Sequence, residues 1–248
     1  DWFPPDDNRS GQLQIGGWMA TSYIADLRRA VSSSRLDRYR PVGGSDPDMA
    51  VDYFWNIALS EALYGGLAVL EVTLRSSIHA ALTNREGTDM WFRALLEPRQ
   101  LREYASAMLT LRERHKGRQP TSGQLVAELT FGFWTTLRSQ PYHQTLWAPN
   151  HMSLVKDVFP NLPPVPNNRH YVHQRYNELR KLRNRGFHHE RIWDRPRLAI
   201  EHREMIEAIA WVSPAVRDNV ILIDHFPDTY QHGRSTIEAN LKANLRIP

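Results

Sequence analysis

Apolar residues recur at helical spacing through most of the chain. The longest such stretch covers residues 48–82, where the apolar positions lie three, four or six residues apart, which places them on one face of a helix (Phe54, Ile57, Leu63, Leu67, Leu70, Leu74 and Ile78). Shorter stretches of the same kind are found at 22–32, 90–96, 100–114, 122–137, 168–187, 197–212 and 235–245. Residues 215–223 fit either a helix or a short buried strand. Strand-like alternation and Asn-Gly turns are nearly absent, so the pattern predicts an all-α fold.

The breaks between these stretches predict how the chain is organised. Residues 40–47, 141–149 and 160–166 are rich in Pro or Gly and are expected to be loops. Gly65 and Gly66 lie inside the long stretch and favour either a kink or the close approach of a neighbouring helix. We expect one domain over residues 19–248, a helical bundle, with residues 1–18 as an irregular leader outside the fold.

Composition narrows the possible chemistry. The 248 residues include no Cys, which excludes disulfides, thiolate zinc sites and a cysteine nucleophile. Absence of Cys also fits a reducing compartment, and a cytoplasmic location is expected. No uninterrupted apolar run approaches the roughly 20 residues that a membrane helix requires, so we expect no membrane association. Nothing in the composition calls for a cofactor.

Positive charge is concentrated in one segment. Residues 169–197 hold nine Lys or Arg and three acidic residues, a formal charge of +6, so the rest of the chain carries −2 of the total of +4. Four of the eleven His also lie there. A basic segment in a chain that is otherwise near neutral is typical of a protein with a polyanionic partner, although a solvated helix face gives the same pattern.

The same segment contains the side chains best suited to catalysis. Arg183 is followed by Asn184 and, five residues on, by His188 and then His189. On an ideal helix five residues separate Arg183 and His188 by about 140°, so they converge only if the helix frays near Gly186 or if a second copy of the motif supplies the partner. Arg183 also lies one turn after Leu179, beside the apolar face, and should need an anionic or hydrogen-bonding partner.

Arg and His side chains can cleave RNA without a metal ion. Histidine can act as base or acid near neutral pH, taking the proton of the 2′-hydroxyl or protonating the leaving oxygen. Arginine binds phosphate oxygens through a forked pair of donors and stays charged. A 2′-hydroxyl nucleophile would restrict the reaction to RNA.

The motif and the sequence around it resemble a known family. Arg-Asn-x3-His resembles the Rx4–6H signature of HEPN domains. Six blocks in order are similar to the AbiD/AbiF-type Abi-like (abortive infection) family over roughly residues 34–214: Leu36-Asp37-Arg38-Tyr39, Tyr53-Phe54-Trp55-Asn56, Leu70-Glu71-Val72-Thr73-Leu74-Arg75, Leu129-Thr130-Phe131-Gly132-Phe133-Trp134, Arg183-Asn184-Arg185 and His188-His189-Glu190.

This resemblance implies a HEPN-like helical bundle with additional helices and a metal-independent endoribonuclease that acts in phage defence as a toxin-like effector. It implies that Arg183 and His188 are catalytic, that Asn184 orients them and that His189 is the alternative histidine. It also implies an active site composed of two motifs across a homodimer, and it leaves open a small RNA or protein antitoxin. We expect four neighbouring cations to bind the RNA (Arg180, Lys181, Arg185 and Arg191). The alternative function is a non-catalytic HEPN module that binds RNA or a phage protein.

Several further residues have two interpretations. Glu71, Arg75 and His79 form one polar face of the long helix, either as an ordinary ion ladder, which we favour, or as a second wall of the site with Glu71 pairing to Arg183 or Arg75. Glu190 supports the histidine pair, and it stands where one HEPN subgroup has a Tyr, so regulation through such a Tyr is not expected.

Histidines and aromatic residues outside the motif have plainer interpretations. The spacing of His170 and His173 does not match a zinc motif, so no metal site is expected. Phe131, Phe133 and Trp134 could stack on bases but are predicted to be core, and Asn56, set among aromatic residues, is predicted to make a buried hydrogen bond.

Overall fold

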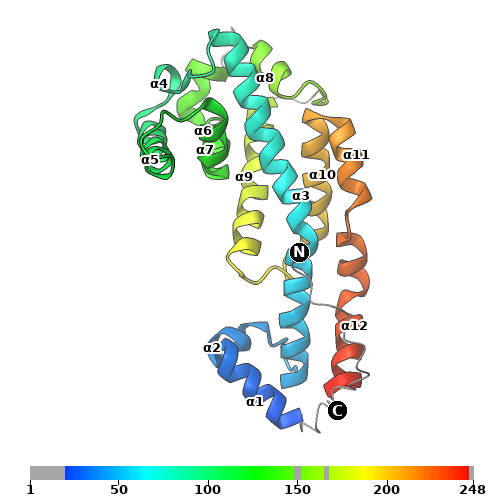
Figure 1. The fold of residues 1–248 in the computed structure, drawn as a ribbon. Helices are drawn as coiled ribbons and strands as arrows, with labels where there is room; N and C mark the ends of the chain where they lie inside the picture. The colour runs from blue at the N-terminus through cyan, green and yellow to red at the C-terminus, as the bar shows by residue number, and fades with distance from the viewer. Residues whose placement is uncertain (1–19, 148–151, 165–167, 246–248) are drawn as a thin grey trace, which may run out of the picture. The chain divides into compact units, whose positions relative to one another are not determined.

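The computed structural model describes residues 20–147, 152–164 and 168–245, and these contain helices and no strand (Figure 1). The all-α class predicted from the sequence is therefore confirmed. The predicted leader at 1–18 lies outside the described residues. The α-helices in chain order are α1 (Ala20–Val31), α2 (Ser33–Leu36), α3 (Asp46–Glu86), α4 (Phe92–Leu95), α5 (Pro98–Arg114), α6 (Ser122–Glu128), α7 (Phe131–Thr136), α8 (Met152–Val158), α9 (Asn168–Phe187), α10 (Leu198–Val212), α11 (Pro214–Leu222) and α12 (Phe226–Leu245).

The chain divides into two compact units, where the sequence pattern predicts one domain. Residues 1–55 and 232–248 form the first, of which 20–55 and 232–245 are described, and residues 56–231 form the second. An ion pair holds the first unit together: Asp52, 1% exposed, accepts a hydrogen bond from Arg234 Nε at 2.8 Å. Burial raises the pKa of the Asp52 carboxyl, and the charge of Arg234 opposes that rise.

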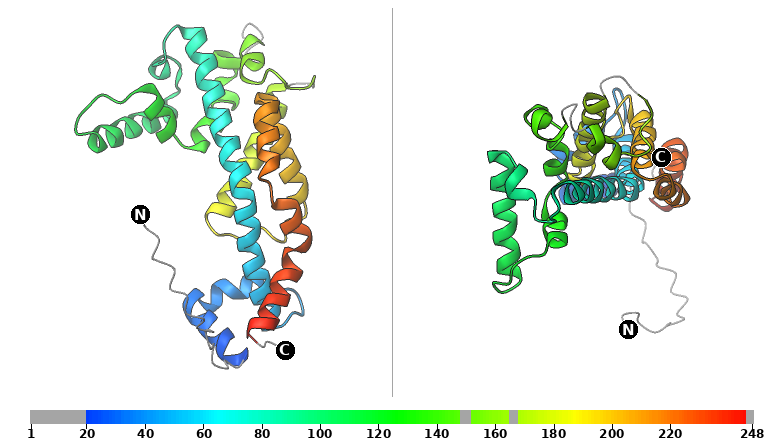
Figure 2. Two further views of the ribbon diagram at one scale, coloured as in Figure 1. Left: turned by 45° about the vertical axis from the view of Figure 1, so that its right-hand side comes forward. Right: turned by 90° about the horizontal axis from the view of Figure 1, so that it is seen from above.

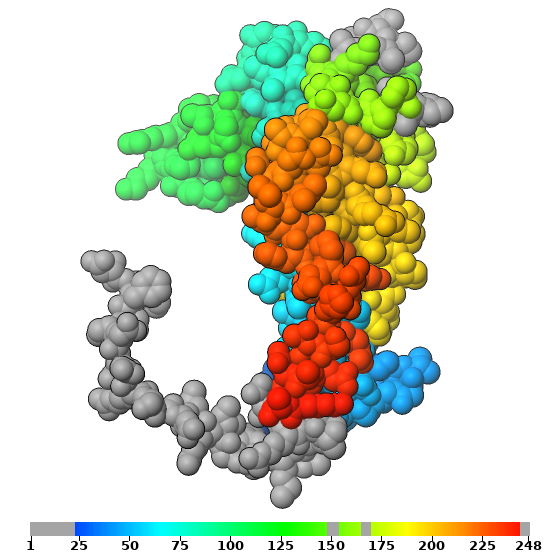
Figure 3. Space-filling view, turned by 90° about the vertical axis from the view of Figure 1, so that its right-hand side faces the viewer, coloured from blue at the N-terminus to red at the C-terminus, as the bar shows by residue number. Residues whose placement is uncertain are grey.

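The second unit is built along the C-terminal part of α3. Helices α9 and α10 run beside it (Figures 1 and 2), and α11 lies next to α10 over one face of this unit (Figure 3). The predicted apolar face of α3 is largely in the core, because Leu63, Leu67, Leu70, Leu74 and Ile78 are at most 2% exposed. Helix α9 contributes its own buried row to the same core (Val172, Tyr176, Leu179 and Leu182). Contacts of Arg183 with Glu71 and of Phe187 with Tyr64 hold the C-terminal end of α9 against α3.

The two glycines of α3 allow close packing within one continuous helix. A Cβ atom at Gly66 would lie 2.9 Å from Met205 Sδ on α10 and closer still to Met205 Cε. A Cβ atom at Gly65 would meet its nearest neighbour, Ile223 Cδ1, at an ordinary 3.8 Å. Of the two interpretations of the glycine pair, Gly66 fits the close approach of a neighbouring helix.

We therefore expect Gly66→Ala and Gly65→Ala to change stability in opposite directions. Gly66→Ala forces the buried Met205 side chain to move and should destabilise the protein by about 1–3 kcal/mol. Gly65→Ala makes only an ordinary contact with Ile223 and should stabilise α3 by about 0.5–1 kcal/mol through helix propensity. Urea unfolding of both variants measures the difference. Equal effects would show that Met205 does not limit the space at Gly66.

Helix boundaries differ from the predicted ones where side chains cap the backbone. The stretch 122–137 is two helices, because the Thr130 hydroxyl accepts a hydrogen bond from the Phe133 backbone N–H at 3.2 Å and starts α7. Helix α6 begins at Ser122, where the pattern begins, but its cap is Thr121 and not Ser122, in a reciprocal capping box with Gln124. Residues 140–147 form 3₁₀ and π turns where a loop was predicted, and residues 214–222 are helix.

One helix among the described residues, α3, is long and apolar enough by length and composition alone to cross a membrane. This finding differs from the sequence expectation because Gly, Ser and Glu residues interrupt the apolar run of α3 while its mean hydropathy stays high. A core helix of a soluble protein can have the same length and composition, and one third of the most apolar stretch of α3 is buried in the fold. Absence of membrane association therefore stays a prediction.

Candidate active site

The C-terminal end of α9 is fixed by backbone hydrogen bonds. The Glu190 N–H donates to Arg185 O at 2.9 Å and the His189 N–H to Gly186 O at 3.1 Å, the pair of bonds that defines a Schellman motif. His189 takes the left-handed position of this motif with φ of +56°, where Gly is the usual residue. Helix α9 therefore stays regular through Gly186, and the backbone turns sharply at His188 and His189.

Arg183 is held by three neighbours on α3 and α9. Its Nη2 lies 3.3 Å from Glu71 Oε2, and its Nη1 donates to Asn184 Oδ1 at 3.4 Å. Its Cζ lies 4.4 Å from the centroid of the Phe187 ring. The Arg183 side chain keeps 28% of its exposure and that of Glu71 16%. The guanidinium is thus oriented but still reachable, as a phosphate-binding group needs to be.

The two histidines after the helix lie at the surface. Both are exposed, as is Glu190, which pairs with Arg185 Nε at 3.4 Å. Among the described residues, no hydrogen bond or ion pair joins the His188 imidazole to another side chain. The structure therefore brings Arg183, Asn184 and Glu71 together. Among the described residues, the only bond from His188 to any of these three is the helical one, from its backbone N–H to Asn184 O at 2.9 Å, and no side-chain hydrogen bond joins its imidazole to them.

Asn56 on α3 anchors the segment that follows the histidines. Its Oδ1 accepts from the backbone N–H groups of Ile192 at 2.7 Å and Trp193 at 3.2 Å, and its Nδ2 donates to Glu190 O at 3.3 Å. The Asn56 side chain is 2% exposed, so the predicted buried hydrogen bond is confirmed. The Asn56 side chain therefore holds the backbone of residues 190–193, which directly follow the two histidines.

Loss of the Asn56 amide should be costly. Asn56→Ala removes three hydrogen bonds and leaves the Ile192 N–H without an acceptor, so we expect a loss of about 2–4 kcal/mol in unfolding free energy. The control is Asn177→Ala on α9, whose half-buried amide accepts one hydrogen bond from Arg180 and should cost about 0–1 kcal/mol. Urea unfolding measures both values. A cost for Asn56→Ala no larger than that of the control would remove its anchoring role.

Arg75 and His79 do not continue a ladder from Glu71. Arg75 Nη1 donates to Ala127 O at 3.4 Å, and His79 Nδ1 accepts from Trp91 Nε1 at 3.2 Å. Burial lowers the pKa of the His79 imidazole, while the charge of Asp89 opposes that shift. The His79 ring stacks on Phe92, within an aromatic cluster that includes the buried Trp134. His79 therefore belongs to a core, and Glu71 alone of this polar face contacts Arg183.

The four cations expected to bind RNA are each paired with a nearby acceptor. Lys181 contacts Glu178 at 2.7 Å, Arg191 contacts Asp194 at 2.9 Å, and Arg180 Nη2 donates to Asn177 Oδ1 at 2.8 Å. With the Arg185–Glu190 pair, these contacts lie at the surface or half-buried. Exposed pairs of this kind contribute about 0–1 kcal/mol, so a phosphate could replace the acceptor at little cost.

The positive excess counted along the sequence is partly cancelled by α10. Arg175 is 12% exposed and lies 3.0 Å from Glu207 and 3.6 Å from Glu204. Arg195 Nε donates to Glu201 Oε2 at 2.9 Å, and Arg197 pairs with Glu204 at 3.1 Å. These acids fall just beyond residue 197. Among the described side chains, the cations that α10 does not pair lie near the C-terminal end of α9 or just after it (Arg180, Lys181, Arg183, Arg185 and Arg191).

The structure places two aromatic residues at the site, Phe187 and Tyr64, which the sequence analysis did not assign to it. Phe187 lies one turn after Arg183, and this i,i+4 spacing could have indicated the contact. The Phe187 ring is stacked against Tyr64 of α3 with centroids 5.2 Å apart and planes 16° apart. Nothing in the sequence links Tyr64 to α9. Phe131, Phe133 and Trp134 are at most 2% exposed, which confirms them as core.

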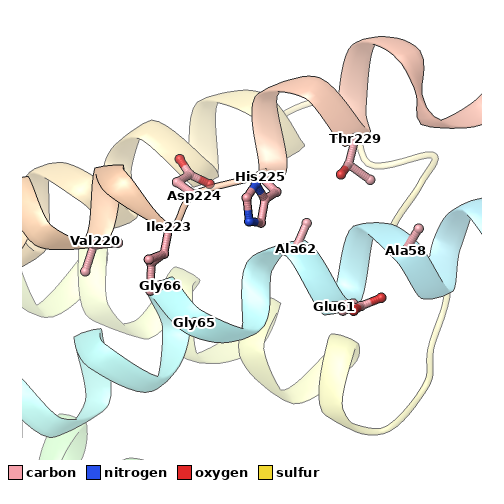
Figure 4. A pocket seen from close by; sticks show the side chains of 10 residues that line it. All are labelled: Ala58, Glu61, Ala62, Gly65, Gly66, Val220, Ile223, Asp224, His225 and Thr229. Carbon is pink, nitrogen blue, oxygen red and sulfur yellow. The ribbon is translucent and has the colours of Figure 1, made fainter. Parts of the chain in front are cut away.

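A separate hollow of about 300 Å³ lies between α3 and the segment joining α11 to α12 (Figure 4). Ala58, Ala62, Gly65 and Gly66 form its α3 side, and His225 and Ile223 point toward them. Asp224 instead pairs with the buried His202 at 2.8 Å. None of the predicted site residues lines this hollow. No group of three or more His, Asp or Glu side chains in residues 20–147, 152–164 and 168–245 is placed to hold a metal ion.

The fold and site together define an all-helical protein with a paired arginine and two exposed histidines at the end of one helix. No family model, no curated protein and no solved structure matches this chain. The resemblance to the Abi-like family therefore rests on the six sequence blocks.

Proposed function

We propose that the chain is a metal-independent endoribonuclease of the HEPN type, acting in the cytoplasm as a toxin-like effector of phage defence. The observation that carries the proposal is the end of α9, where Arg183 is oriented by Glu71 and Asn184 while His188 remains exposed and without a side-chain partner among the described residues. A positioned cation and an available imidazole are the groups that RNA cleavage requires.

The proposed reaction divides the work between these groups. A histidine takes the proton from the ribose 2′-hydroxyl, and the 2′-oxygen attacks the adjacent phosphorus. The guanidinium of Arg183 binds the phosphate oxygens as negative charge develops on them. The bond to the 5′-oxygen breaks, that oxygen takes its proton from a protonated histidine acting as the acid, and the products carry a 2′,3′-cyclic phosphate and a 5′-hydroxyl.

We propose that two copies of the chain supply the complete site. Helix α9 does not fray at Gly186, and Arg183 faces Glu71 while His188 lies beyond the turn. This geometry favours the second of the two alternatives from the sequence, in which another copy of the motif provides the partner. An RNA or protein antitoxin would act by covering the same residues.

The test is incubation of the purified chain with total RNA and a tRNA pool in EDTA, beside Arg183→Ala and His188→Ala. Cleavage that survives EDTA, leaves cyclic-phosphate ends and disappears in both variants supports the nuclease. Cleavage that needs a divalent ion, or that both variants retain, contradicts it.

A non-catalytic RNA-binding module is the second candidate. It is favoured by the contacts of Arg183 with Glu71 and Asn184, which already occupy two edges of the guanidinium. This candidate predicts RNA affinity that falls with salt and no cleavage by any version of the chain.

A further inference from the structure

The aromatic contact beside Arg183 has a feature that packing does not explain. Tyr64 lies on α3 with 58% of its surface exposed, although one face of its ring is stacked on Phe187. A parallel stack that leaves one ring face open to solvent is suited to extension by another flat ring. The bases of nucleic acids are such rings, and every base has a face that can stack.

The stack also reaches the proposed phosphate-binding group. The Arg183 guanidinium lies 4.4 Å from the Phe187 ring, and the Tyr64 ring lies 5.2 Å from the same ring. The Tyr64 ring is therefore no farther from the guanidinium than these two distances together, so a short stretch of RNA can contact both groups. Glu71 also contacts the guanidinium, at 3.3 Å, so the arrangement does not depend on the ligand.

We propose that Tyr64 is a stacking platform for an unpaired RNA base next to the phosphate that Arg183 binds. This inference rests on the proposed function and names its substrate class: single-stranded RNA or the loops of folded RNA. In a duplex the bases are paired and stacked on one another, so none is free to cover the Tyr64 ring.

Two other exposed apolar side chains on α3 indicate what else could cover the Tyr64 ring. Ile57 and Val72 are 45% and 44% exposed and lie about two turns before and after Tyr64. Together with Tyr64 they could bind a second copy of the chain. The two occupants differ in chemistry, because a base needs the aromatic ring alone, whereas a second copy would use all three apolar side chains.

The experiment uses His188→Ala as the parent, so that RNA stays intact, and a single-stranded RNA carrying 2-aminopurine as the probe. We expect quenching of the probe on binding and preference for the single strand over the same sequence in a duplex. Tyr64→Leu should weaken single-strand binding by roughly 5- to 100-fold, whereas Tyr64→Phe should retain it. Urea unfolding confirms that both variants fold.

The controls are Ile57→Ala and Val72→Ala, which should leave RNA affinity unchanged. Unchanged affinity and quenching in Tyr64→Leu would overturn the inference. Equal loss of affinity in all three positions, together with loss of self-association by light scattering, would also overturn it and assign the face to a second copy.

Failure of the proposed nuclease gives a different result. If the unmodified chain cuts no RNA but Tyr64→Leu still weakens binding, the stacking site stands and the nuclease does not. If the unmodified chain cuts RNA and Tyr64→Leu binds and cuts it equally well, the nuclease stands and the stacking site does not.

Discussion

Replacement of His188 by Ala is expected to lower the rate of RNA cleavage by about 10²- to 10⁴-fold while RNA affinity changes little. This range is the usual contribution of one acid or base group to catalysis. His188 is exposed, and its imidazole makes no side-chain hydrogen bond among the described residues, so the substitution removes a proton-transfer group without disturbing packing. Single-turnover cleavage and fluorescence anisotropy with a labelled RNA measure the two quantities.

The matched control is His189→Gly. His189 has a left-handed backbone, where Gly is less strained, so this change removes an imidazole and should not destabilise the helix end. Cleavage by His189→Gly at the rate of the unmodified chain, with loss in His188→Ala, would assign the chemistry to His188. The reverse result would assign it to His189, the alternative histidine of the motif.

The helix content could be predicted from the sequence because it depends on local patterns. The position of the active site at the end of α9 rests on a local motif as well, and it stays a prediction. Apolar spacing placed α3, α5, α9 and α10 within a few residues of their observed bounds. The ends of helices were harder to predict where a single side chain determines them. Thr130 starts a new helix inside a continuous apolar pattern, and α8 lies in a short stretch between two expected loops.

The partners of the site residues depended on long-range contacts, which a single sequence does not specify. Glu71 was predicted to pair with Arg183 only as the less favoured of two alternatives, because its position on α3 also fits a ladder with Arg75. His79 has the same spacing from Arg75 but turns into an aromatic core. The acids of α10 lie outside the basic segment in sequence and beside it in space, so counting charge along the chain overestimated the free positive charge.

Replacement of Arg183 by Lys is expected to lower cleavage by about 10²- to 10³-fold although the charge is kept. A Lys ammonium cannot bind a phosphate through a planar fork, and the loss of one preorganised donor has an effect of this size on the transition state. It also lacks the flat guanidinium that covers the Phe187 ring. Single-turnover cleavage measures the loss. A rate equal to that of the unmodified chain would show that only charge is needed at this position.

Stability separates the role of Arg183 in the fold from its role in the reaction. Arg183→Ala leaves the Glu71 carboxylate, 16% exposed, without its cation, and we expect a loss of about 1–3 kcal/mol in unfolding free energy. Glu71→Gln in the same chain removes that uncompensated charge and should restore part of the stability without restoring cleavage. Arg185→Ala is the control. Arg185 lies on the last turn of α9, and its exposed pair with Glu190 should contribute less than about 1 kcal/mol. Recovery of cleavage together with stability in the double variant would mean that Arg183 acts only by holding α9 against α3, and that the phosphate is bound elsewhere.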